Sequence, residues 1–175
     1  MPFIETPIAD LLIFEPNVWQ DERGYFFESY NEQSFAAAGL TYRFVQDNEA
    51  KSTKGVLRGL HFQKGEAAQA KLVRVTEGEV FDVAVDMRPN SNTYGQWYGT
   101  ILSVENKRQL LVPRGFAHGY LVMTDTAVFN YKCDNFYNRE AEGGIRYNDP
   151  TIGVAWPVLD VPYQLSPKDE KWALL

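Results

Sequence analysis

The segment GVLRGLHFQ (residues 55–63) places an arginine and a histidine in what reads as a β-strand. Arg58 and His61 are three residues apart, so a regular strand would direct their side chains to opposite faces. Gly59 lies between them, and a glycine inside a strand often marks a β-bulge. A bulge there would bring both side chains to one cavity, where the imidazole could exchange protons and the guanidinium could bind an anion. The alternative for His61 is a half-buried core histidine, and the alternative for Arg58 is an ordinary surface cation.

The second histidine lies in LVPRGFAHGYLV (111–122), whose P-x-G-x-x-H pattern resembles the second motif of the cupin barrels. Metal-binding cupins carry an H-x-H pair and a glutamate in their first motif, where this chain has His61, Phe62 and Gln63. Two histidines and one cysteine cannot supply three imidazoles. A two-histidine, one-carboxylate iron site stays open if His61 and His118 meet. We expect the cupin shape without a metal.

Strand-like runs with turn residues between them make up most of the chain and predict an all-β protein. We expect a cupin (jelly-roll) β-barrel or sandwich with a few short peripheral helices, forming a single domain over residues 1–175. One helix is expected in NEQSFAAAGL, opened by Asn31 and ended by Gly39. A second is expected in SPKDEKWALL, with Ser166 as N-cap and Pro167 at the first helical position.

The composition narrows the function classes. Apolar residues make up 45% of the 175 residues and aromatic residues 14%, which indicates a packed globule. A net charge of −6 argues against binding to nucleic acid or to an anionic membrane. If the ligand is an anion, basic side chains must be clustered at its binding site. The single Cys133 and an N-terminal segment without a basic start or a long apolar run predict a cytoplasmic protein.

Seven segments together resemble the dTDP-4-dehydrorhamnose 3,5-epimerase family, in order and over nearly the whole chain. They are DERGYFFES (21–29), FVQDN (44–48), KGVLRGLHFQ (54–63), AKLVRVTEGEVFDVAVDMR (70–88), NKRQLLVPRGFAHGYLV (106–122), YKCDNFYNREAEGGIRYND (131–149) and LSPKD (165–169). The resemblance implies a cupin barrel without a cofactor, usually a homodimer. The implied substrate is a dTDP-4-keto-6-deoxy sugar that is inverted at carbons 3 and 5 on the route to dTDP-rhamnose. Asn130 departs from the family pattern beside a critical strand and could affect which carbons are inverted.

The chemistry of such an inversion needs three groups. A hydrogen on the carbon next to a ketone is acidic because the negative charge of the carbanion delocalises onto the carbonyl oxygen. The site therefore needs a base, a group that stabilises the enolate, and an acid on the face of the sugar opposite the base. The family motifs assign His61 as the base, Lys71 as the stabiliser and Tyr131 as the acid. Pattern alone leaves Lys71 open as an edge-strand charge, and it leaves Tyr131 open as a core residue.

The resemblance also implies that Asp169 orients His61. The alternative is local, since Ser166 to Asp169 forms a capping-box arrangement in which Asp169 caps its own helix. Asp82 and Asp86 are the other candidate partners of His61.

The remaining expected contacts are to the substrate. Arg23, Arg58 and Lys168 suit the diphosphate, and Phe26 with Glu28 suits a thymine ring and its N–H. His118 is expected to donate to a sugar oxygen or the enolate, with a turn-stabilising core histidine as the alternative. The other expected substrate contacts are Gln46, Asp47, Asn48, Lys71, Tyr137 and Glu142.

Three other functions stay open on sequence. A relative that inverts only carbon 3 or only carbon 5 would use the same residues. A sugar-nucleotide-binding cupin without turnover would show no solvent exchange, and a metal-dependent cupin isomerase or dioxygenase would lose activity with a chelator.

Overall fold

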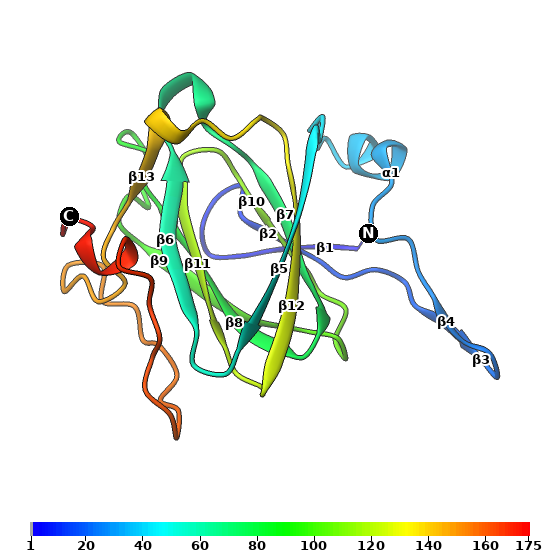
Figure 1. The fold of residues 1–175 in the computed structure, drawn as a ribbon. Helices are drawn as coiled ribbons and strands as arrows, with labels where there is room; N and C mark the ends of the chain where they lie inside the picture. Colours follow the sequence, from blue (N-terminus) through cyan, green and yellow to red (C-terminus); the bar gives the residue numbers. More distant parts are fainter. Residues whose placement is uncertain (1) are drawn as a thin grey trace.

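The computed structural model describes residues 2–175 and consists mainly of two β-sheets packed face to face (Figure 1). The six-stranded sheet has the order β1 (Phe3–Glu5), β2 (Leu12–Phe14), β10 (Gln109–Val112), β7 (Lys71–Glu77), β12 (Thr126–Cys133) and β5 (Gln46–Thr53). The five-stranded sheet has the order β13 (Glu142–Gly144), β6 (Leu57–Gln63), β11 (Phe116–Val122), β8 (Glu79–Asp86) and β9 (Trp97–Ser103). The predicted all-β, jelly-roll architecture with a few short helices is confirmed.

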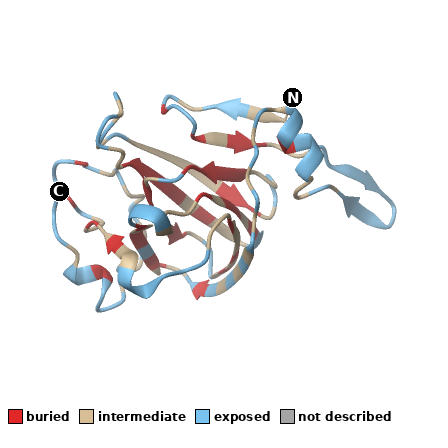
Figure 2. Ribbon diagram, turned by 90° about the horizontal axis from the view of Figure 1, so that it is seen from above, coloured by how far each residue is buried: buried red, intermediate tan, exposed pale blue. Residues whose placement is uncertain are grey.

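The main core lies between the two sheets. Alternate residues of each strand point inward, so Val73, Val75 and Phe129 of the six-stranded sheet pack against Val80 and other residues of the five-stranded sheet. Figure 2 shows the buried residues concentrated along the central strands.

The five-stranded sheet is also covered on its outer face. A second cluster there joins Leu60, Val83 and Ala117 to Ile145 and Ile152 of the C-terminal segment. Burial on both faces explains why every residue of β11 is buried, although the strand alternates in the usual way.

The two predicted helices have different outcomes. The first is confirmed as α1 (Glu32–Ala37), where the Asn31 side chain accepts hydrogen bonds from the amides of Gln33 and Ser34. The predicted C-terminal helix is wrong, because only one 3-10 turn forms, η3 (Asp169–Lys171). Trp172 leaves the turn in an extended conformation and packs elsewhere, which ends the helix. Two further 3-10 turns are η1 (Gly65–Ala67) and η2 (Arg139–Ala141).

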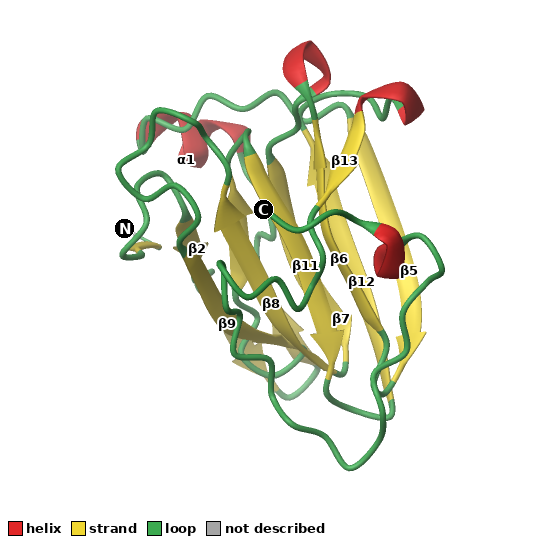
Figure 3. Cartoon of the chain, turned by 90° about the vertical axis from the view of Figure 1, so that its left-hand side faces the viewer, coloured by secondary structure: helices red, strands yellow, loops and turns green. Residues whose placement is uncertain are grey.

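A two-stranded hairpin, β3 (Trp19–Asp21) and β4 (Gly24–Phe26), projects away from the sandwich (Figure 1). Its aromatic side chains are largely uncovered, with Trp19, Tyr25 and Phe26 exposed by 57%, 56% and 67%. At the other side of the molecule the C-terminal segment crosses beside β6 (Figure 3). It is joined there by a bridge between Val56 and Gln164.

None of the helices in residues 2–175 has the length and apolar character needed to cross a membrane.

Candidate active site

The bulge predicted at Gly59 is confirmed by the pairing of β6 with β11. His61 lies opposite His118, and Arg58 lies opposite Tyr120, so β6 carries one more residue than its partner strand between these pairs. Gly59 has a φ of +132°, and a Cβ at this position would lie 2.5 Å from the Cα of Gly119. Only glycine fits this close approach of the two backbones. As a result, Arg58 and His61 line one cavity.

That cavity has a volume of about 900 Å³ and lies between the two sheets, closed on one side by residues 164–169. Its described lining holds three cations, Arg58, Lys71 and Lys168, and both histidines. Asp169 is the only carboxylate among those lining residues. A chain with a net charge of −6 therefore gathers positive charge at this cavity.

His61 is paired with Asp169. The Nε2 atom of His61 lies 2.5 Å from Oδ1 of Asp169, and Asp169 is only 2% exposed. Burial raises the pKa of the Asp169 carboxyl, but the hydrogen bonds to His61 and Ser166 and the charges of His61 and Lys168 together outweigh burial, and the net pKa is lowered. Because an ionised carboxylate only accepts, Nε2–H donates to it and Nδ1 is left as the proton-accepting nitrogen.

The capping alternative for Asp169 is only half realised. The Asp169 amide donates to the Ser166 hydroxyl oxygen at 3.2 Å, as in a capping box. The Asp169 carboxylate, however, reaches His61. The structure therefore contains the His61–Asp169 contact that the family resemblance implies.

His118 is also paired with a carboxylate, that of Asp82. Both oxygens of Asp82 lie 3.0 Å from Nε2 of His118, and Asp82 is fully buried. Asp82 and Asp86 were the other candidate partners of His61, and neither takes that place. Asp86 instead accepts hydrogen bonds from Arg88, Ser91 and Thr93. The two histidines meet as cross-strand neighbours, but within residues 2–175 no three His, Cys, Asp or Glu side chains are grouped to hold a metal ion.

Lys71 and Tyr131 reach the same cavity from the six-stranded sheet. Their strands β7 and β12 are neighbours, and the Lys71 Nζ lies 6.0 Å from the centre of the Tyr131 ring. Since β7 is paired on both sides, the edge-strand interpretation of Lys71 is wrong. Burial lowers the pKa of Lys71 and raises the pKa of Tyr131. The Tyr131 hydroxyl is thus held in its protonated form at neutral pH.

The arrangement supplies groups on two sides of one hollow. His61 comes from the five-stranded sheet, and Tyr131 comes from the facing six-stranded sheet. A proton can therefore be removed on one side of a bound molecule and returned on the other.

Four predicted contacts, Glu142, Tyr137, Gln46 and Asn48, are not among the lining residues but connect to them through side-chain contacts or a shared strand face. Lys168 Nζ lies 2.6 Å from a carboxylate oxygen of Glu142, and the Tyr137 hydroxyl donates to the same carboxylate at 3.4 Å. Gln46 donates to Asn48 at 2.9 Å, on the face of β5 that includes the cavity residue Ala50.

The other four predicted substrate contacts lie outside the lining without such a connection in their own chain. Arg23 and Phe26 lie on the exposed hairpin, and Glu28 follows it and accepts a hydrogen bond from Asn31. Asp47 points to the outer face of β5, where Lys132 donates to it.

Sequence reasoning missed two residues beside the site. Ser52 accepts hydrogen bonds from Nε and Nη2 of Arg58 at 3.2 and 3.1 Å. Its place two and four residues beyond Ala50 and Asn48 on β5 was the available signal. Trp172 packs against His61, and no local pattern predicts that contact.

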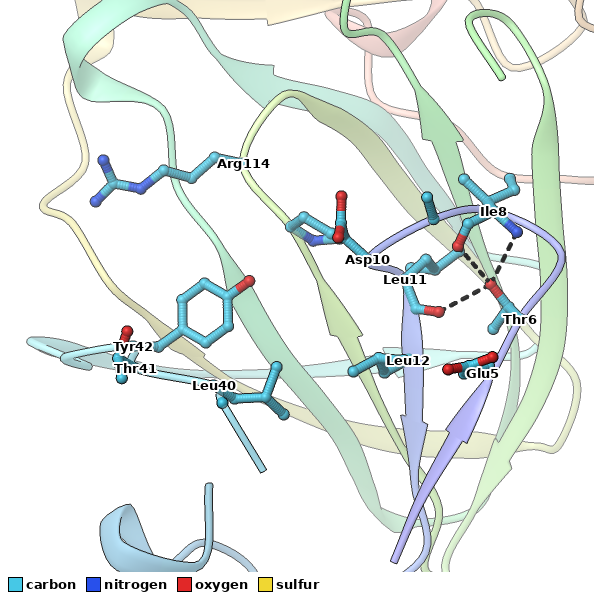
Figure 4. A pocket seen from close by; sticks show the side chains of 13 residues that line it. Glu5, Thr6, Ile8, Asp10, Leu11, Leu12, Leu40, Thr41, Tyr42 and Arg114 are labelled. Atoms are coloured by element: carbon cyan, nitrogen blue, oxygen red, sulfur yellow. Dashed lines mark hydrogen bonds between the residues drawn. The ribbon is translucent and has the colours of Figure 1, made fainter. Parts of the chain in front are cut away.

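A second hollow of about 740 Å³ lies at the turn between β1 and β2 (Figure 4). It is lined by none of the predicted site residues. Two of its three charged side chains, Asp10 and Arg114, are engaged by Arg88 and Asp134 respectively, and the third is Glu5. The candidate active site is therefore the cavity between the sheets.

Comparison with known proteins agrees with this geometry. The family model described as dTDP-4-dehydrorhamnose 3,5-epimerase matches residues 5–175. The chain belongs to the dTDP-4-dehydrorhamnose 3,5-epimerase family. The epimerase of that name from Salmonella typhimurium is 56% identical over 176 residues, covering 100% of this chain and 96% of the relative.

Solved structures of the family superpose closely on this chain. The dTDP-4-dehydrorhamnose 3,5-epimerase from Elizabethkingia anophelis has a TM-score of 0.94 at 55% identity, covering 98% of this chain and 94% of the other. The dTDP-6-deoxy-D-glucose-3,5-epimerase from Legionella pneumophila, in complex with dTDP-4-keto-L-rhamnose, has a TM-score of 0.95 at 51% identity. That match covers 98% of this chain and 91% of the other.

Proposed function

We propose that this family member inverts carbons 3 and 5 of a dTDP-4-keto-6-deoxyhexose by proton abstraction and redelivery. The observation that carries the proposal is the placement of His61 and Tyr131 on facing sheets at one cavity. The family match and the keto-sugar named with the Legionella pneumophila structure support the substrate class.

In the proposed mechanism Nδ1 of His61 takes the proton from C3 or C5. The electron pair of the C–H bond forms a C=C bond, and the carbonyl pair moves onto the C4 oxygen. The Lys71 ammonium stabilises this enolate, and His118 contacts the sugar. The Tyr131 hydroxyl then gives its proton to the carbon from the opposite face. The imidazolium and phenolate return to their starting forms by exchange with solvent, so these steps need no metal or nicotinamide.

The diphosphate suits the cationic part of the lining. Arg58 is held by the Ser52 hydroxyl rather than by a carboxylate, so its charge stays available for phosphate oxygens. Lys168 can exchange its partner Glu142 for the substrate at the rim. Gln46, Asn48 and Tyr137 are joined by hydrogen bonds, and their amide and aromatic groups suit the nucleoside.

We also propose a homodimer in which the hairpin of one copy completes the site of the other. This assembly reconciles the expected roles of Arg23, Phe26 and Glu28 with their distance from the cavity of their own chain. Burial of the exposed aromatic side chains of the hairpin against the second copy would stabilise the dimer. The single buried cysteine supports a cytoplasmic location.

Mixed dimers test this assembly. His61→Asn and Arg23→Ala are each expected to inactivate a homodimer. If the hairpin acts on the partner, a mixed dimer has one site with an intact His61 and an intact Arg23, and half of the wild-type activity returns. If each hairpin serves its own chain, mixing restores nothing.

Incubation with the keto sugar in deuterated water tests the reaction. Deuterium at both C3 and C5 is expected, and Tyr131→Phe should reduce turnover by at least about 10²-fold. Deuterium at one carbon only would identify a single-site epimerase. Absence of any exchange would contradict the proposed catalysis and favour a binding protein.

A further inference from the structure

Trp172 lies directly against the proposed base. The centres of the Trp172 and His61 rings are 6.2 Å apart, with an angle of 65° between the ring planes. Trp172 follows η3, whose first residue Asp169 bonds to the same histidine. Trp172 is not among the residues that line the cavity, so it contacts the His61 ring on the side away from the cavity.

Gly144 provides the space for this indole ring. Gly144 pairs with His61 across β13 and β6, so a side chain at position 144 would stand beside the imidazole. A Cβ there would lie 2.3 Å from the Trp172 ring. The φ of Gly144 is not in the left-handed region, so the backbone does not require glycine here. Glycine is required because the Trp172 ring occupies the space that a side chain at position 144 would need.

The residues after Trp172 hold it in place. Arg146 donates from Nε to the Trp172 carbonyl at 3.3 Å and from its amide to the Ala173 carbonyl at 3.1 Å. The Leu175 amide donates to the buried Asp149 carboxylate at 2.6 Å. These contacts fix the chain end on the loop after β13.

The catalytic carboxylate depends on this anchor. η3 is a single turn of three residues, and one turn does not hold its shape without tertiary contacts. Before the turn the chain is fixed by the Gln164 amide, which donates to the Gly55 carbonyl at 2.8 Å. After the turn it is fixed by Trp172.

We propose that Trp172 is a positioning residue that holds the His61–Asp169 pair in the geometry that aims Nδ1 of His61 into the cavity. This inference rests on the proposed function for its kinetic consequence, while its structural consequence can be measured without substrate. The Trp172 Nε1–H has no hydrogen-bond partner within residues 2–175. The contact is therefore made by the ring, and phenylalanine should preserve most of it.

Kinetics of Trp172→Ala and Trp172→Phe test the role. Trp172→Ala should lower kcat by about 10–100-fold with KM changed less than about twofold, because the substrate does not touch the indole. Trp172→Phe should recover kcat to within about threefold of wild type. In an Asp169→Asn background Trp172→Ala should cost little more, because the pair it positions is already broken. Trp156→Leu is the matched control, since Trp156 packs on Phe81 away from the cavity and should leave kcat unchanged.

Proton NMR of the free protein gives the second readout. The signal of the His61 Nε2–H, identified by its loss in Asp169→Asn, should disappear in Trp172→Ala and persist in Trp172→Phe. Persistence of this signal in Trp172→Ala, or an equal loss of kcat with and without Asp169, would overturn the inference. If the wild type shows no solvent exchange but the NMR result holds, the proposed reaction fails and the positioning role stands.

Discussion

Replacing Asp169 by asparagine removes the negative charge of the proposed catalytic pair, His61 and Asp169, with almost no change of volume. Asp169 is buried, and its carboxylate accepts from Nε2 of His61 at 2.5 Å. A hydrogen bond to a charged group contributes about 1.5–3 kcal/mol. If the reaction uses that whole contribution, kcat should fall by about 10–150-fold, since 1.4 kcal/mol corresponds to a factor of ten. KM should change little, because the carboxylate is directed at the histidine.

The same variant makes a separate prediction for stability. The pKa of Asp169 is lowered in the folded protein, so its ionised form stabilises the fold above the unfolded pKa of about 3.9. This stabilisation is lost as the pH falls through the lower, folded pKa. Urea unfolding at a series of pH values should therefore give a wild type more stable than Asp169→Asn at pH 7 and a difference that shrinks below about pH 4.

Two results would refute this reasoning. An Asp169→Asn enzyme with wild-type kcat would mean that the carboxylate does not orient the base. A stability difference that stays constant from pH 7 to pH 3 would mean that the charge of Asp169 is not what holds the pair together.

Three other perturbations follow from the site. Burial lowers the pKa of Lys71 and raises the pKa of Tyr131, so deprotonation of Lys71 should cause the fall of kcat at alkaline pH. Lys71→Arg should move this fall to higher pH in a pH–rate profile, because arginine keeps its charge. A fall at the same pH in the variant would contradict this assignment. Gly59→Ala should lower the free energy of unfolding, measured with urea, by at least about 2 kcal/mol and should abolish most of the activity. Gly39 is the control, since it also has a positive φ but nothing within 4 Å of its Cβ. Gly39→Ala should therefore lower the free energy of unfolding by less and keep the activity. Asn130 bonds to Glu49 and Thr76 on the outer face of the sheet, so Asn130→Ala should leave the deuterium pattern unchanged, and a shift from two labelled carbons to one would restore its suspected role.

The features that could be predicted from the sequence were those with a local cause. Period-two alternation fixed most strands, and the side chain of Asn31 began α1 as expected. The bulge at Gly59 was predictable because two polar side chains three apart can share a face only if the strand gains a residue.

The features that escaped prediction depend on register between distant segments. Alternation places Asp82 and Asp86 on one face of β8, but the pairing of β8 with β11 decides that Asp82 meets His118 and that Asp86 meets no histidine. Trp172 was expected inside a helix, and its real position is set by the space above Gly144, 28 residues earlier in the chain. The hairpin residues Arg23 and Phe26 are not among the lining residues of the cavity in their own chain, and the proposed dimer would supply the contact that sequence reasoning expected.

The electrostatics of the cavity explain how an acidic protein can hold an anionic sugar nucleotide. The ion pairs found within residues 2–175 include Lys168 but neither Arg58 nor Lys71. Arg58 is oriented by a neutral hydroxyl, and the thiol beside Lys71 stays neutral because burial raises the pKa of Cys133 to about 11. A carboxylate in either place would fix the cation equally well but would cancel its charge. Because no carboxylate within residues 2–175 forms an ion pair with Arg58 or Lys71, their positive charge stays available for the phosphate and the enolate of the proposed reaction.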